Sequence, residues 1–251
     1  PKAWSPSTNG AVTGEVLFID AATDSALDLY RGKLKGKFVL ISDPREIKAH
    51  FDPEATRDQD STLLKMANSD APREGFSMRR MLQGQTPEAK RRALVNYHKL
   101  DMCTKEGALG ILTMSSGDGG NIFVQQASVP VHPDTPFVSR VSVYENRAPK
   151  IIPQFSVGAE HYNRLVRMMQ KGEHPKLEIN LDGTFNKADS AYNVIAEIPG
   201  TDLKDEVVMI GAHFDTWHGG TGATDNGTGS SVCMEALRIL KKLDLKPRRT
   251  I

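Results

Sequence analysis

The sequence has little of several kinds of residue, and each shortage excludes a class of protein. Only two cysteines occur in 251 residues, which excludes a disulfide scaffold and a zinc site built from cysteines. Aromatic residues make up 6%, and no run of about 18 apolar residues occurs, so no membrane-spanning segment is expected. Lys and Arg number 32 against 31 Asp and Glu, and a formal net charge of +1 argues against binding nucleic acid through a broad basic surface.

The composition is otherwise that of a folded globular chain. Hydrophobic residues make up 39% and charged residues 25%, which is enough for a packed core, and the length predicts one large domain or two ordinary ones. The first four residues, PKAW, lack the charged-then-apolar pattern of a signal peptide. Cys103 and Cys233 lie in segments predicted to be helical, and we expect two buried free thiols.

The first part of the chain has the pattern of strands separated by an insertion. Short apolar runs at residues 15–20, 37–42 and 108–114 predict three strands. Residues 45–87 are charged and broken by proline and glycine, so we interpret them as short helices and loops. Thr86 is predicted to cap a helix in which Pro87 is the first residue.

From residue 152 onward the pattern becomes a regular succession of helices and strands. Helices are expected over 162–169 and 229–243, and strands over 176–185, 191–198 and 207–212. The segment 207–212 is continuously apolar, which is typical of a central strand covered on both faces. A strand, a loop and a helix in this order predict an α/β crossover unit.

Polar groups that carry chemistry gather directly after this apolar segment. His213 and Asp215 are two residues apart on an extended chain, so their side chains are expected on the same side. Asp225 follows a glycine-rich loop, near the start of the next predicted helix. Imidazole nitrogen and carboxylate oxygen are common ligands of catalytic zinc, and a carboxylate often orients a ligating histidine. The pattern therefore indicates a metal site.

Two motifs in this region resemble those of the co-catalytic dizinc exopeptidases. They are HFDTW at 213–217 and GATDNGTG at 222–229, preceded by the lead-in YNVIAEIPG at 192–200. This is the family of plasma glutamate carboxypeptidase, glutamate carboxypeptidase II and secreted bacterial aminopeptidases. Residues 14–155 resemble more loosely the protease-associated domain inserted in many of these enzymes, with a long insertion near 45–100.

The resemblance implies an α/β fold with two parts. Residues 14–155 are expected to form a β-rich protease-associated domain, and residues 156–251 the partial first half of an α/β/α zinc exopeptidase domain. The remaining metal ligands and the general base, a glutamate, are expected beyond residue 251. The chain is therefore interpreted as an internal fragment that is inactive alone. Family members are exported, which implies a periplasmic or extracellular location.

The resemblance also implies a role for each matching residue. His213 corresponds to a terminal ligand of one zinc ion, Asp225 to the carboxylate that bridges both, and Asp215 to the catalytic-site acid that orients the histidine. The implied reaction is hydrolysis of a peptide substrate by a metal-bridging water. His218 has no assigned role. The other histidines match no motif and are expected to be solvated: His50, His98, His132, His161 and His174.

Two other readings remain open on the sequence alone. The first is a non-catalytic receptor-like or peptide-binding protein that keeps the fold without its metals, although retention of His213 and Asp225 argues against it. The second is that residues 14–155 form the functional unit and bind protein or peptide partners. Nothing in the sequence indicates the oligomeric state or the preferred side chain of a substrate.

Overall fold

The computed structural model describes residues 1–51, 53, 57–69, 86–117, 119–123, 125–186, 190–217 and 220–251. The chain forms two compact units, Pro1–Thr184 (unit 1) and Phe185–Ile251 (unit 2). The domain boundary expected between residues 155 and 156 falls inside unit 1, because the strands on either side of it belong to one sheet.

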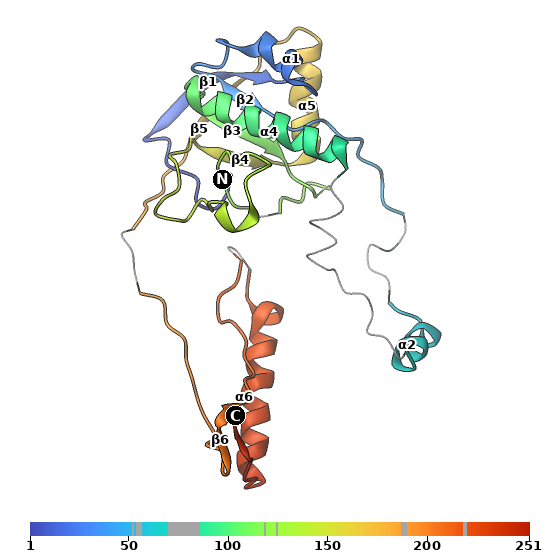
Figure 1. The fold of residues 1–251 in the computed structure, drawn as a ribbon. Helices are drawn as coiled ribbons and strands as arrows, with labels where there is room; N and C mark the ends of the chain where they lie inside the picture. The colour runs from blue at the N-terminus through green and yellow to red at the C-terminus, as the bar shows by residue number, and fades with distance from the viewer. Residues whose placement is uncertain are drawn as a thin grey trace. The chain divides into compact units, whose positions relative to one another are not determined.

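Unit 1 is built on a five-stranded mixed sheet (Figure 1). Its strands are β1 (Ala11–Phe18), β2 (Phe38–Leu40), β3 (Gly110–Met114), β4 (Gln154–Val157) and β5 (Lys176–Asn180). Their spatial order is β4-β3-β2-β1-β5. Strands β1 to β4 pair in parallel, and β5 pairs antiparallel with β1. Three predicted strands are therefore confirmed as neighbours in one parallel arrangement.

Helices cover both faces of this sheet (Figure 1). One face carries α4 (Pro87–Lys105) with α1 (Asp24–Leu27) and the following turn η1 (Asp28–Tyr30), and the other carries α5 (Ala159–Gln170). The predicted start of α4 is confirmed, because the Thr86 hydroxyl accepts a hydrogen bond from the Ala89 amide at 3.2 Å. Such a cap satisfies an amide that has no partner within the helix.

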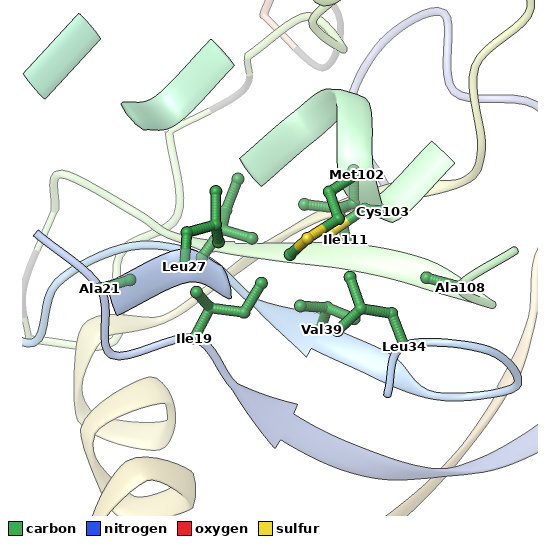
Figure 2. Packing of buried hydrophobic residues seen from close by; sticks show 10 residues of the cluster. Ile19, Ala21, Leu27, Leu34, Val39, Met102, Cys103, Ala108 and Ile111 are labelled. Carbon is green, nitrogen blue, oxygen red and sulfur yellow. The ribbon is translucent and has the colours of Figure 1, made fainter. Parts of the chain in front are cut away.

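The core of unit 1 follows the two-residue period of its strands. Val39 and Ile111 face α4 and pack with Met102 and Cys103, as Figure 2 shows. Their neighbours on β2 and β3 face α5 and pack with Tyr162 and Val166: Phe38, Leu40 and Leu112. Alternate side chains of a strand point to opposite faces, so both faces of this central pair are apolar and buried.

The predicted insertion contains one described helix, α2 (Asp60–Ala67), all of whose residues are exposed. Residues 70–85, which the sequence also assigns to the insertion, lie outside the described residues. A short turn, η2 (Phe137–Ser139), lies in the long irregular segment between β3 and β4.

Unit 2 contains two short parallel strands, β6 (Leu203–Val207) and β7 (Arg249–Thr250), a turn, η3 (Ala223–Thr228), and α6 (Gly229–Lys242). The helix confirms the prediction over 229–243. The strand predicted over 191–198 was wrong, since that segment has no strand and only Ile198 exchanges main-chain hydrogen bonds with Ile251.

The segment 207–212 also differs from the prediction of a buried central strand. Only Val207 lies in a strand, and Val208, Met209 and Ile210 are 46%, 86% and 45% exposed. Among the described residues of unit 2, β7 is the single strand that pairs with β6, and none of these residues is buried. A strand that has a neighbour on just one side has its other edge exposed to water, and here its faces are exposed as well.

The chain is thus a mixed α/β protein, as the sequence predicted. None of the described helices is long and apolar enough to cross a membrane.

Candidate functional site

The polar residues of the predicted site lie in unit 2, between the end of the apolar segment and the start of α6. His213 follows this segment directly, and Asp225 lies in the turn η3, which leads into the helix. Gly222 precedes the turn with a φ of 71° in the left-handed region, which glycine adopts without strain. The Asp225–Asn226 peptide bond is cis. The turn reverses the chain and brings Asp225 back toward His213.

The structure brings the three predicted residues together around one imidazole ring. The Nε2 atom of His213 lies 3.1 Å from Oδ1 of Asp225. On the opposite edge of the ring, Nδ1 lies 2.9 Å from the main-chain oxygen of Asp215 and 3.1 Å from its Oδ1. The side chains are 52%, 63% and 90% exposed for His213, Asp225 and Asp215, so the ring nitrogens are held by acceptors while the group stays open to solvent.

These acceptors determine the electrostatics of the ring. The pKa of His213 is raised above its ordinary value, first by the hydrogen bond to the Asp215 carbonyl. Slight burial lowers it, and the negative charges of Asp215 and Asp225 raise it further. Each acceptor stabilises positive charge on the ring, and a site of this kind attracts cations generally.

Hydrogen bonds from α6 and the turn stabilise the loop that carries the site. The Ser230 hydroxyl, in the first turn of α6, donates to the main-chain oxygen of His213 at 3.4 Å. The Thr228 hydroxyl donates to the Thr224 oxygen at 2.7 Å. These contacts connect the residue after the apolar segment to the beginning of the helix. Sequence reasoning did not assign a role to Ser230, and no sequence signal identifies it.

Among the described residues of the site, two side chains are candidate ligands of one metal ion. Among the residues that the structure describes, no group of three or more His, Cys, Asp or Glu side chains is placed to bind one metal ion. His218 lies outside the described residues. His213 and Asp225 are thus the two candidate ligands that the structure pairs, with Asp215 on the far edge of the imidazole.

The other histidines and the cysteines lie apart from this group in the sequence. His98 on α4, which we expected to be solvated, is 37% exposed, and its Nδ1 lies 2.6 Å from Oδ1 of Asp24. Both cysteines are free; Cys103 is buried as expected, whereas Cys233 is only half-buried. The prediction of two buried thiols is therefore confirmed for one of them.

Comparison with known proteins identifies the segment that contains the site. Residues 193–251 match Peptidase family M28. Carboxypeptidase Q of Xenopus laevis is 38% identical over 109 residues, which cover 43% of this chain and 23% of that protein. Leupeptin-inactivating enzyme 1 of Streptomyces exfoliatus is 37% identical over 60 residues, or 24% of this chain and 14% of that protein. The chain thus spans less than a quarter of the length of these relatives.

Solved structures support the same fold. The crystal structure of a peptidase M28 precursor from Shewanella amazonensis SB2B matches 99% of this chain and 45% of that chain, with a TM-score of 0.53 and 20% identity. An aminopeptidase from Aneurinibacillus sp. strain AM-1 matches 98% of this chain and 43% of that chain, with a TM-score of 0.51 and 18% identity. The resemblance seen in the sequence is confirmed for residues 193–251, the segment that matches Peptidase family M28.

Proposed function

We propose that the protein carrying this chain is a metallo-exopeptidase, which removes terminal residues from peptides or cleaves dipeptides with a water bridging two zinc ions. The observation that carries the proposal is the pairing of His213 and Asp225 within the segment that matches Peptidase family M28. The names of the relatives, a carboxypeptidase and enzymes called aminopeptidases, agree with an exopeptidase.

The chemistry and spacing of the two side chains fit a zinc ion. Zinc takes imidazole nitrogen and carboxylate oxygen at about 2.0–2.2 Å, so two ligands at a tetrahedral angle lie about 3.3 Å apart. The Nε2 and Oδ1 atoms of His213 and Asp225 lie 3.1 Å apart and face each other. Both side chains are more than half exposed, so an ion reaches them without unfolding the loop.

Each residue has a distinct part in the proposed reaction. His213 would hold a zinc ion through Nε2, and Asp225 would hold it through its carboxylate, whose Oδ1 faces that nitrogen. The main-chain oxygen of Asp215 accepts a hydrogen bond from Nδ1–H of His213, which leaves the lone pair of the neutral ring on Nε2. When bound, the zinc ions lower the pKa of the bridging water and polarise the carbonyl of the scissile bond.

The experiment compares metal content and turnover in the protein that carries this chain. We expect His213→Ala and Asp225→Ala to abolish hydrolysis of simple dipeptides and to lower the zinc content measured by mass spectrometry, because each removes a ligand outright. The matched control is His161→Ala, which removes an exposed histidine of α5 in unit 1.

Two outcomes would reject the proposal. Full zinc content and normal turnover in the Asp225→Ala protein would show that this carboxylate is not part of the site. Zinc binding by the wild type with no turnover on any peptide substrate would favour a non-catalytic peptide-binding protein of the same fold. Chain 1–251 alone is expected to bind zinc weakly and to lack activity, because its described residues bring two ligands together, whereas catalytic zinc takes three from the protein.

The organisation of the rest of the protein belongs to the same proposal. We propose that unit 1, which contains residues 14–155, is a protease-associated-like domain, and that the protein lies outside the cytoplasm, in the periplasm or the medium. The name "precursor" of the Shewanella protein agrees with processing of that relative. Fractionation of cells that express the protein tests the location.

A further inference from the structure

One edge of β1 is paired over only part of its length among the described residues. The Val16 amide donates to the Pro175 oxygen at 2.9 Å, just before β5 begins. The Ile19 amide donates to the Leu40 oxygen of β2 at 3.0 Å, on the opposite edge of the strand. Because main-chain groups alternate along a strand, the amide and the oxygen of Phe18 point to the same edge as the Val16 amide, where β5 no longer runs beside β1.

This part of the edge opens into a groove. The amide and the oxygen of Phe18 have no main-chain partner among the described residues. The groove has a volume of about 730 Å³, and residues 15–18 form its floor. One wall is the loop between η1 and β2, which carries Lys33 and Lys35, and the other is the end of α5, with Met169. An unpaired strand edge thus lies between two walls that belong to opposite faces of the sheet.

The wall that carries the lysines is held in place by α4. The Glu106 carboxylate, directly after this helix, accepts hydrogen bonds from the Gly32 amide at 2.9 Å and the Leu34 amide at 3.3 Å. Lys33 lies between these two residues and Lys35 follows them. This wall is therefore formed before any ligand binds, which lowers the entropic cost of binding.

The charges of the groove differ between its two walls. Lys37 and Glu15 neutralise each other, with Nζ and Oε2 2.6 Å apart. The two lysines of the loop have no ion-pair partner among the described residues. The other carboxylates of the groove, Asp20 and Glu173, lie after β1 and after α5. The loop wall therefore attracts acidic side chains, whereas the α5 wall, with Met169, favours apolar ones.

We propose that this groove binds an extended segment of a partner protein, which adds to the sheet as a strand antiparallel to β1 and carries acidic residues at alternate positions. Such a segment continues the line of β5, which is itself antiparallel to β1. The residue opposite Phe18 has its side chain on the α5 face, because opposite residues share a face and Phe18 packs there. The residues on either side of it then face Lys33 and Lys35. The inference concerns unit 1 and does not depend on the metal site.

The probe is a fluorescein-labelled peptide in which valine and glutamate alternate. Its ends are acetylated and amidated, so it offers no free terminus to an exopeptidase, and its binding to the protein that carries this chain is followed by fluorescence anisotropy. N-methylation of the valines removes the amides expected to face Phe18, whereas N-methylation of the glutamates removes amides that face away from β1. We expect the first to weaken binding by at least about threefold and the second to change it by less than about twofold.

The double variant Lys33→Glu, Lys35→Glu tests the charged wall. We expect it to weaken binding by at least about fivefold, because two attractive contacts become repulsive. The matched control is Lys48→Glu with Lys90→Glu, which changes the net charge equally at two exposed lysines outside the groove. This control should stay within about twofold of the wild type. A peptide with lysine in place of glutamate should bind the wild type less tightly than the original peptide.

Several results would overturn the inference. They are a wild type that does not bind the alternating peptide, equal or reversed affinities of the two N-methylated forms, and equal losses in the two double variants. A dimer in sedimentation that the peptide dissociates would assign the edge to a second copy of the chain instead. The N-methylated peptides are measured on the wild type, so they test the inference even where a variant does not fold.

Discussion

Removing the Tyr162 hydroxyl tests how unit 1 holds the loop that follows β2. The side chain of Tyr162 is fully buried, at 0% exposure, between α5 and the sheet. Its hydroxyl donates to the main-chain oxygen of Ser42 at 2.8 Å and accepts from the Ser42 amide at 2.8 Å. One phenolic oxygen thus satisfies both main-chain groups of a residue 120 positions away.

The variant Tyr162→Phe isolates these two hydrogen bonds. The phenyl ring keeps the packing of the tyrosine ring against Phe38, Leu40 and Val166, so the apolar area buried on folding is nearly unchanged. Each hydrogen bond contributes about 1 kcal/mol net, which gives a loss of about 2 kcal/mol in the free energy of unfolding. For a chain of this size the loss corresponds to a decrease of about 4–8 °C in Tm.

The assay is urea unfolding of chain 1–251 followed by circular dichroism, since all buried residues that the structure describes lie in unit 1. The matched control is Tyr30→Phe, because the Tyr30 hydroxyl accepts one hydrogen bond, from the exposed Asp20 amide at 3.1 Å. We expect a decrease of less than about 1 kcal/mol there. Equal losses in the two variants would show that the two buried hydrogen bonds at Ser42 stabilise the fold no more than the single exposed one at Asp20.

Two further predictions concern the core of unit 1. Gly14→Ala should destabilise the chain by about 1–3 kcal/mol in urea unfolding, because its Cβ would lie 2.8 Å from the Gly36 oxygen. Gly183→Ala has open space around it and should stay within about 0.5 kcal/mol, so equal midpoints for the two variants would contradict the packing. Burial raises the pKa of the Cys103 thiol to about 12, which lowers its thiolate fraction at pH 8 about a thousandfold. Mass spectrometry after alkylation should find Cys233 modified first, and rapid labelling of native Cys103 at pH 8 would refute its burial. Because the folded pKa lies above the unfolded one, the protonated thiol stabilises the fold fully below about pH 9 and progressively less up to about pH 12.

Elements with local signals could be predicted from the sequence. The hydrogen bond that caps α4 joins Thr86 to Ala89, and Pro87 lies between them. All of these residues are close in the sequence, so the start of α4 could be predicted. The helical spacing of apolar residues likewise predicted α5 and α6. In each case the information lies within a few turns of the helix itself.

Elements that depend on distant partners could not be predicted in the same way. The apolar residues over 191–198 and 208–212 favour strands, but a strand forms only where another strand pairs with it. Main-chain bonds do join Ile198 to Ile251 and Val208 to Thr250, yet no ladder extends beyond them among the described residues. The contact of Tyr162 with Ser42 is equally invisible in the sequence, because nothing near either residue indicates the other.

In the candidate site, too, some features could be predicted from the sequence and others could not. His213 and Asp225 were found because an imidazole and a carboxylate flank a glycine-rich loop after an apolar segment, and because their motifs resemble a family. The carbonyl of Asp215 was missed because every residue has a carbonyl, and only the path of the chain decides which one meets the ring. Sequence patterns identify side-chain chemistry, whereas main-chain acceptors become visible once the loop conformation is known.

The glycines of the loop show how the sequence determines the course of the main chain around the candidate site. Gly222 has a φ of 71°, which turns the chain immediately before the segment that carries Asp225. At Gly229 a Cβ atom would collide with the side-chain amide of Asn226, so any other residue there would force that side chain to move. The sequence predicted that these glycines permit unusual conformations and close approach. The structure gives the reason for one of them: the turn after Gly222 precedes Asp225, whose carboxylate lies 3.1 Å from a histidine 12 residues earlier, so this glycine contributes to the pairing of the two candidate ligands.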